Sequence, residues 1–465
     1  MKKANLFKRE IAENEAWFNG STTVLEHFFK VQWPNFKVTT MFDKKPNFWN
    51  SVSGDIPRVH SGVPALISKT WVRLINPRDI EIVVDKDQDR LDEILKDNKF
   101  KTTFLPKLIA TMSWGGYAVG KISYDEGMPI LEVVTPKFAK AKVKRDRIEG
   151  FEFEIYEKDL IIVEHYDKSG VWYEAFNEVA GERRPEPVPS EYEDVELAGG
   201  LIPAQLFNNT PYNSRFPELI YGESDYSNIH SQLHQLDSVL AHTQLDIEAS
   251  KSKQFINDDL ILVDDEGNEH FDKNETVIRL ASSLMQDPNF DLKKMITLLQ
   301  PDVRVEQFNA TAKEITGRIL ANVGLSAVSV GLPGFDAVDA AADSQRARKE
   351  TSIVSRNEKV ATLTEDLSEF IPLILNIDNV MSGREVQEYD VSIEFDKYGA
   401  PTWEDLVSTV VEAVQGNVMS VREAVDILYD GREDDEKERL IKDIKSEGLI
   451  TFTEGDLTDD GGAVE

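Results

Sequence analysis

Apolar and polar residues alternate with a period of two over much of the region between residues 120 and 176. This alternation predicts half-buried β-strands. The alternating stretches are Gly120–Tyr124, Pro129–Val134, Ile148–Tyr156, Leu160–Tyr166 and Gly170–Phe176. Because short turns join them, they predict an antiparallel meander rather than a series of βαβ units.

Helical periodicity precedes and follows this meander. Apolar residues three and four apart predict helices over Asp89–Asn98 and Phe100–Trp114, the second with Pro106 inside. A longer helix is predicted over Ser224–Ser252, which contains neither Pro nor Gly. At 1.5 Å per residue this helix would reach about 40 Å. Its apolar stripe consists of Ile229, Leu233, Leu236, Val239, Leu240 and Ile247. The stripe indicates either an ordinary surface helix or a helix that packs against copies of itself.

The second half of the chain mixes short strands, helices and one hydrophobic loop. Strands are predicted over Phe255–Val263 and Glu275–Leu280, around an acidic turn, with an extended piece at Val303–Phe308 and a last strand at Tyr389–Phe395. Helices are predicted over Asp291–Leu299, Ala310–Val323, Ala340–Ile374 (ending near Pro372), Trp403–Leu428 and Asp434–Glu447. Gly324–Val338 reads as a loop of glycine and small apolar residues, and the acidic end of the chain is predicted to be disordered. Together these elements predict an α+β chain.

Composition narrows the possible functions. The 465 residues include 84 acidic and 52 basic side chains, which give a net charge of −32, and there is no cysteine. Such a chain repels nucleic acid on average, so a tight duplex binder is disfavoured. The absence of cysteine excludes disulfides, thiolate metal sites and a cysteine nucleophile. There is no uninterrupted apolar run long enough to span a membrane, and we expect no signal peptide at the charged start of the chain.

One stretch matches a phosphate-binding pattern. Gly115–Lys121 reads GGYAVGK, which has the spacing of the loop that cradles nucleotide phosphates. That loop follows a strand, opens a helix and has Ser or Thr next, whereas Ile122 follows here and a strand is predicted. The favoured interpretation is a helix end at which glycines turn the chain into a hairpin. Nucleotide binding remains an alternative.

Two possible metal-binding motifs are incomplete. His230 and His234 share a helix face but lack the glutamate of the HExxH zinc motif. Asp264–Glu269 has carboxylates without the order of a calcium loop, so a hairpin turn is favoured. We therefore expect no catalytic residue, no metal and no cofactor.

Two stretches carry a resemblance to a known family. Phe308–Ser352 reads FNATAKEITGRILANVGLSAVSVGLPGFDAVDAAADSQRARKETS, and Lys107–Val143 reads KLIATMSWGGYAVGKISYDEGMPILEVVTPKFAKAKV. The first is similar to the second stem helix, tunnel loop and following long helix of tailed-phage portal proteins. The second resembles the wing region of these proteins, where a helix turns into a meander. The order of regions over most of the chain resembles this family, in particular portals of phages with non-contractile tails.

The resemblance implies a portal fold, with a wing of helices and meander, a helical stem, a small α/β clip, a tunnel loop and a helical crown. The implied parts are residues 1–221 (N-terminal wing), 222–254 (first stem helix), 255–302 (clip), 303–324 (second stem helix), 325–337 (tunnel loop), 338–400 (long wing helix and closing strand), 401–447 (crown) and 448–465 (acidic tail).

The same resemblance implies the function. Twelve subunits would form a ring at one capsid vertex, which is the channel for double-stranded DNA during packaging and ejection. The implied partners are the terminase large subunit, head-completion or adaptor proteins, and the major capsid and scaffolding proteins, with no membrane. The protein would assemble in the host bacterial cytoplasm and reside in the virion.

Candidate contact residues follow from this assignment. The loop contains neither Lys nor Arg, so it would touch DNA by van der Waals contact and would not clamp phosphates. Its DNA-facing candidates are Ser326, Val328, Val330, Leu332, Pro333 and Phe335. Lys251 and Lys253 are candidates for phosphate contact, although solvated lysines at a helix C-terminus explain them equally well. Partner-binding candidates in the clip are Asp259, Asp264, Glu266, Glu269 and Arg279. A different phage structural protein, such as a scaffold or baseplate component, is the other alternative.

Overall fold

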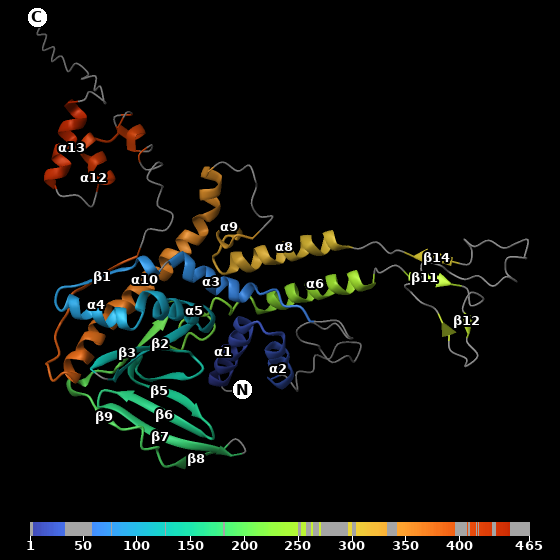
Figure 1. The fold of residues 1–465 in the computed structure, drawn as a ribbon, viewed down its shortest axis with the longest axis horizontal. Coiled ribbons are helices and arrows are strands. Elements are labelled where there is room, and N and C mark those ends of the chain that lie inside the picture. Colours follow the sequence, from blue (N-terminus) through green and yellow to red (C-terminus); the bar gives the residue numbers. More distant parts are fainter. Residues whose placement is uncertain are drawn as a thin grey trace, which may run out of the picture. The chain divides into compact units, whose positions relative to one another are not determined.

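The computed structural model divides the chain into two compact units, Met1–Asp396 and Lys397–Glu465 (Figure 1). It describes residues 3–32, 58–75, 77–125, 127–179, 182–249, 253–256, 262–263, 269–270, 296–299, 304–332, 342–395, 407, 410–414, 416, 418–429 and 434–446.

The first unit is α+β, as the sequence predicts. Its helices are α1 (Lys3–Asn19), α2 (Thr22–Gln32), α3 (Val63–Ile75), α4 (Gln88–Asp97), α5 (Leu105–Gly115), α6 (His230–Ala249), α8 (Val305–Asn322), α9 (Ala327–Val330) and α10 (Ala342–Met381). Among the described residues, no helix is long and apolar enough to cross a membrane.

The strands of this unit form antiparallel sheets. The largest has the order β4-β5-β6-β7-β8, with β9 also paired to β7. A second has the order β10-β2-β3, and β1 with β15, β11 with β14 and β12 with β13 form pairs. Their bounds are β1 Glu81–Val84, β2 Tyr117–Asp125, β3 Met128–Val134, β4 Ala139–Lys144, β5 Arg147–Glu157, β6 Leu160–Asp167, β7 Gly170–Val179, β8 Glu182–Glu186, β9 Val195–Glu196, β10 Ala204–Asn208, β11 Lys253–Ile256, β12 Leu262–Val263, β13 Glu269–His270, β14 Ile296–Leu299 and β15 Val391–Glu394. The predicted hairpin and meander are confirmed as β2–β3 and β5–β7.

The core of the first unit lies where α3, α5 and α10 pack with the β10-β2-β3 sheet. The Phe370 ring of α10 lies 5.2 Å from that of Phe207 and 5.7 Å from that of Phe104, measured between ring centroids. Gly120 of β2 lies directly beneath these rings, and a Cβ atom there would come within 2.8 Å of Phe207. This approach requires glycine because the rings occupy the space of a side chain.

Prolines mark two differences from the predicted helices. The helix predicted over Phe100–Trp114 is divided, because Phe100–Phe104 forms a π-helical turn and α5 begins at Leu105. Pro106 thus lies in the first turn of α5, where a missing N–H costs nothing. The end predicted near Pro372 is wrong, since α10 continues to Met381. Burial of neighbouring apolar side chains, each worth about 2 kcal/mol, offsets an interior proline that costs about 3 kcal/mol.

Two segments that precede α8 also differ from their predicted secondary structure. The helix predicted over Asp291–Leu299 is wrong at Ile296–Leu299, which is strand β14 and pairs with Lys253–Ile256. The extended piece predicted over Val303–Phe308 is wrong from Val305 onward, where α8 begins. The acidic turn predicted after Val263 is supported by the β12–β13 pairing, while Glu275–Leu280 lies outside the described residues.

The second unit contains α12 (Val421–Leu428) and α13 (Asp434–Ser446), as predicted for a helical pair. Val410, Val414, Val421 and Ala424 form its small apolar cluster. Ser420 and Glu423 form a capping box at the start of α12, which interrupts the single helix predicted over Trp403–Leu428. Residues 448–465 lie outside the described residues.

Candidate functional site

The candidate site is the antiparallel pair formed by α6 and α8 together with the segment that follows α8. The two helices pack along their length (Figure 1). Leu233 and Leu236 of α6 and Ile315 and Ile319 of α8 are buried. α6 begins at His230, so the helix predicted from Ser224 is six residues too long at its start. Part of the apolar stripe is therefore covered within the subunit, while Ile247 is exposed.

Polar contacts fix both ends of this helix pair. Near the end of α6, Asp246 accepts the backbone N–H of Arg304 at 2.9 Å and its guanidinium at 2.7 Å. These two bonds lower the pKa of the Asp246 carboxyl and anchor the first residue before α8. At the opposite end, Asn322 Nδ2 donates to Gln232 Oε1 at 3.0 Å. The chain leaves α6 into β11 and returns to α8 from β14, and these strands pair with each other.

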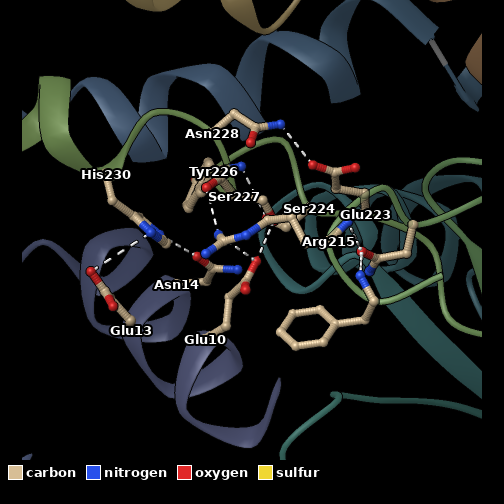
Figure 2. A network of polar contacts seen from close by, with 12 residues as sticks. Glu10, Glu13, Asn14, Arg215, Glu223, Ser224, Tyr226, Ser227, Asn228 and His230 are labelled. Atoms are coloured by element: carbon tan, nitrogen blue, oxygen red, sulfur yellow. Dashed lines mark hydrogen bonds and ion pairs between the residues drawn. The ribbon is translucent and has the colours of Figure 1, made fainter. Parts of the chain in front are cut away.

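A cluster of polar residues holds the base of α6 on α1 (Figure 2). Ser227 Oγ donates to Glu10 Oε1 at 2.5 Å, and the Arg215 guanidinium lies 3.1 Å from the same oxygen. Arg215 also donates to the Ser227 carbonyl at 2.7 Å. Ser227 and Glu10 are both buried, so the hydroxyl is closed to a substrate. This part of the cluster neutralises a charge and joins α1 to α6.

His230 completes the same junction (Figure 2). Its Nε2 lies 2.6 Å from Asn14 Oδ1, and because Oδ1 only accepts, Nε2 carries the proton. Burial, together with the charge of Arg215, lowers the pKa of His230 to about 3. Burial also raises the pKa of Glu13 to about 7, and the Glu13 carboxylate lies 3.7 Å from His230 Nδ1. His230 is therefore uncharged at neutral pH and serves as a hydrogen-bond donor.

A second buried pair secures α6 about two turns further on. Asp237 is fully buried, and its carboxylate accepts the backbone N–H of Ser61 at 2.9 Å and contacts His60 Nδ1 at 2.8 Å. This pair could not be predicted from the sequence, because 177 positions separate its members and no local pattern joins them. Asp237 and His230 thus attach two successive points on one face of α6 to the body of the first unit.

The segment after α8 is more ordered than a loop. Ala327–Val330 forms the single helical turn α9, which packs against α3 and α10. Ser326 Oγ accepts the N–H of Ser329 at 3.2 Å, and the Ser326 N–H donates to Ser352 Oγ at 2.7 Å. The side chain of Val330 is 6 % exposed. The expectation that Val330 faces a ligand is therefore corrected, since this side chain belongs to the core.

The remaining predicted contact residues divide into two groups. Ser326, Val328 and Leu332 are half-buried in the described segment, and Lys253 and Glu269 lie on strands β11 and β13. The others lie outside the described residues, namely Pro333, Phe335, Lys251, Asp259, Asp264, Glu266 and Arg279. Contact of any of these residues with DNA or a partner stays a prediction.

Gly115–Lys121 forms the helix end and hairpin that the sequence favours. Gly116 ends α5 with a φ of 82°, and Lys121 lies in strand β2 rather than in a loop. The Lys121 ammonium is buried and lies 2.7 Å from Glu164 and 3.0 Å from Glu132. Lys121 is therefore already paired with two carboxylates and is not available to bind a nucleotide phosphate.

His234, like His230, has structural partners. The His234 ring packs edge-on against Trp17 and Phe29, with centroids 5.0 and 4.9 Å apart. Burial lowers the pKa of His234 to about 4. Within the described parts of the chain, no group of three His, Cys, Asp or Glu side chains is placed to hold a metal ion.

Comparisons with known proteins give similarities to solved structures only. No protein-family model matches the chain. No curated protein matches it either. The structure is similar to a chain in the virion of a native gene transfer agent particle, at 11 % identity and a TM-score of 0.45, covering 81 % of this chain and 96 % of that one.

Two further similarities come from the necks of such particles. One is a chain of the native neck determined with C12 symmetry, at 13 % identity and a TM-score of 0.44, covering 77 % of this chain and 88 % of that one. The other is a chain of the empty-particle neck determined with C6 symmetry, at 12 % identity and a TM-score of 0.46, covering 79 % and 90 %. At these identities and TM-scores the similarities support no inference about function.

Proposed function

We propose that this protein is a portal-type subunit, which forms a closed, twelve-membered ring around a channel for double-stranded DNA. The α6–α8 pair would line the channel as the stem. The observation that supports this proposal is the excursion of the chain along α6, through the paired strands β11 and β14, and back along α8. In this proposal residues 255–302 are the clip, residues 325–337 the tunnel loop and residues 401–447 the crown.

The exposed face of α8 suits a duct for DNA. It carries Glu306, Lys313, Glu314 and Arg318, so the positive and negative charges on this face balance. Arg318 also donates to Glu314 at 2.5 Å, which reduces the charge available to an outside group. Tight binding to DNA requires several free cations that displace counterions. A face with balanced charge would instead contact the duplex weakly and without sequence preference, as sliding requires.

The proposed partners follow from the ring. The clip would dock the terminase large subunit during packaging and the head-completion proteins afterwards, and the wing would meet the major capsid and scaffolding proteins. ATP hydrolysis would belong to the motor, and the portal subunit itself would have no catalytic role. Ser326, Val328 and Leu332 would contribute to the DNA-facing segment, while Val330 would support it from the core.

Native mass spectrometry with negative-stain imaging of the purified full-length protein tests the ring. Twelve subunits of 52.6 kDa predict an assembly of about 630 kDa with a central opening wide enough for a duplex of roughly 20 Å. Filaments or low-order assemblies in the presence of scaffolding protein would favour another phage structural protein. A compact dimer would contradict the proposal.

The nucleotide-binding alternative has its own test. Lys121→Ala leaves Glu164 buried without its cation, which destabilises a protein by about 3–5 kcal/mol. The proposal predicts this loss of stability together with no detectable ATP binding by the wild type in isothermal titration calorimetry. Stoichiometric ATP binding that Lys121→Ala abolishes would support the alternative.

A further inference from the structure

Two turns at one end of the largest sheet bring four cations together. The β4–β5 turn carries Lys144, Arg145 and Arg147, and the β6–β7 turn carries Lys168. The two turns lie at the same end of the sheet because β4 to β7 are successive antiparallel neighbours, and Gly150 of β5 stands opposite Asp167 of β6. We call Lys144, Arg145, Arg147 and Lys168 the cationic tip.

Most cations of the cationic tip form no ion pair within the described residues. All four side chains are exposed, and Lys144 approaches Glu149 at 3.4 Å. Arg145, Arg147 and Lys168 form no ion pair with another described residue. With Asp146, Glu149 and Asp167 counted, the two turns carry four cations against three carboxylates, a net charge of +1 in a chain of net charge −32.

Asp167, at the end of β6, is engaged within its own turn. Asp167 Oδ1 accepts the backbone N–H of Ser169 at 2.8 Å, and Oδ2 accepts Trp172 Nε1 at 3.1 Å. These hydrogen bonds, together with the serine hydroxyl, lower the pKa of Asp167 despite some burial, so the group organises the turn. It is not placed to neutralise the arginines by direct contact.

The backbone of the β4–β5 turn is strained at the arginine. Arg145 and Asp146 have φ values of 52° and 57°, the left-handed conformation that a two-residue type I′ turn requires at both central positions. Asn-Gly is the favoured pair there, and Arg-Asp carries a steric cost. This conformation places the exposed Arg145 at the end of the hairpin.

The chemistry of the surrounding surface selects the ligand. A cavity of about 960 Å³ lies between the two turns. Its lining consists of Lys144, Arg145, Arg147, Ile148, Glu149, Asp167, Lys168 and Ser169. Ile148 is the one apolar side chain among them. The centre of a protein–protein interface is rich in aromatic and apolar residues, whereas phosphate contacts are made by Arg, Lys and Ser.

We propose that the cationic tip binds the phosphate backbone of a nucleic acid, weakly and without sequence preference. The inference is independent of the proposed ring. The tip lies on the turns of the β4–β8 sheet, whereas the proposed channel lining consists of the helices α6 and α8. With three free cations, each neutralising one phosphate, the logarithm of the binding constant should fall with the logarithm of salt concentration with a slope of about −3. The dissociation constant should lie in the non-specific range of roughly 10⁻⁴ to 10⁻⁶ M.

A closed duplex circle is the appropriate probe, because it cannot thread a ring and so reports only outer surfaces. Binding of the full-length protein to a fluorescent, covalently closed circle is measured by anisotropy at 50 to 200 mM salt. We expect the double variant Arg145→Glu/Arg147→Glu to weaken binding at least tenfold and to bring the salt slope to about −1. The matched control, Lys96→Glu/Lys101→Glu, changes the net charge equally at exposed sites elsewhere and should bind like the wild type.

Three outcomes would overturn the inference. The wild type could fail to bind the circle at 50 mM salt, or both double variants could lose the same affinity for the circle. The protein could also bind polyglutamate as tightly as the circle. The last result would mark the tip as a surface for an acidic protein. If charge reversal in the strained turn prevents folding, Arg147→Gln/Lys168→Gln leaves that turn's central residues unchanged and should reduce the slope by about two. A native mass of twelve subunits without binding to the circle would reject the tip while leaving the ring intact.

Discussion

Replacing Asp366 of α10 by Asn should stabilise the protein at neutral and alkaline pH. Asp366 Oδ2 accepts the backbone N–H of Asn208 in β10 at 3.1 Å. Burial, together with the nearby charges of Glu369 and Glu365, raises the pKa of this carboxyl from 3.8 to about 7 against that hydrogen bond. The Asn side chain keeps an acceptor oxygen for the same N–H and has no charge to desolvate.

The sign and size of the effect follow from proton linkage. The folded-state pKa of Asp366 lies above the unfolded value, so between pH 4 and 7 the folded protein holds a proton that the unfolded chain has lost. The stabilisation from the protonated group is fully present below pH 4 and is lost as the pH rises through 7. Each unit of pKa shift corresponds to 1.36 kcal/mol, so the loss above pH 7 approaches about 4 kcal/mol. Solvent relaxation around a half-buried carboxyl makes this value an upper limit.

Urea unfolding followed by tryptophan fluorescence between pH 4 and 8.5 measures the effect at a fixed protein concentration. The difference in unfolding free energy between Asp366→Asn and the wild type should rise from near zero at pH 4 to a plateau above pH 7. Glu358→Gln removes an exposed carboxylate about two turns earlier on α10, which is not among the charges that act on Asp366, and is the matched control. A difference that stays constant across this pH range would refute the reasoning, because it would place the pKa of Asp366 near its unfolded value.

Three further substitutions test the packing of α6, α5 and α8. Leu233→Ala removes a fully buried side chain and should lower the unfolding free energy by about 2–5 kcal/mol, and a shift below 1 kcal/mol in urea would contradict its burial. Gly116→Ala places a Cβ atom 2.7 Å from a backbone oxygen at a φ of 82°. This variant should therefore have a lower melting temperature than Gly127→Ala, whose glycine has a similar φ and open space around it. Equal losses of melting temperature in the two variants would argue against the close approach. Asp246→Ala frees the backbone N–H of Arg304 and should increase hydrogen exchange in the first turn of α8, and unchanged protection would show that this contact does not hold the helix start.

Local patterns were sufficient for the β2–β3 hairpin and for β5 to β7. These strands follow from the alternation of apolar and polar residues and from the short turns between them, although β6 is buried on both faces. The same reasoning failed at the start of α6. Residues 224–229 have helical spacing, but Ser224 Oγ accepts the N–H of Tyr226 and donates to the carbonyl of Trp114, which favours a turn.

The contacts that position α6 could not be predicted from the sequence. His60 and Asp237, like Asp225 and Lys359, come from distant parts of the chain, and periodicity carries no information about such pairing. Val330 shows the same limit for the proposed DNA-facing segment. Its small apolar neighbours are equally typical of an exposed loop and of a turn that packs on a core, and only the position of α3 and α10 decides between them.

The measurement that tests the central proposal most directly is a cryo-electron microscopy map of the purified full-length assembly, computed without imposed symmetry. The proposal predicts a closed ring of twelve subunits in which α6 and α8 of every subunit surround a central channel wide enough for a duplex. A ring with α6 and α8 away from the channel, or an assembly without a central opening, would contradict it.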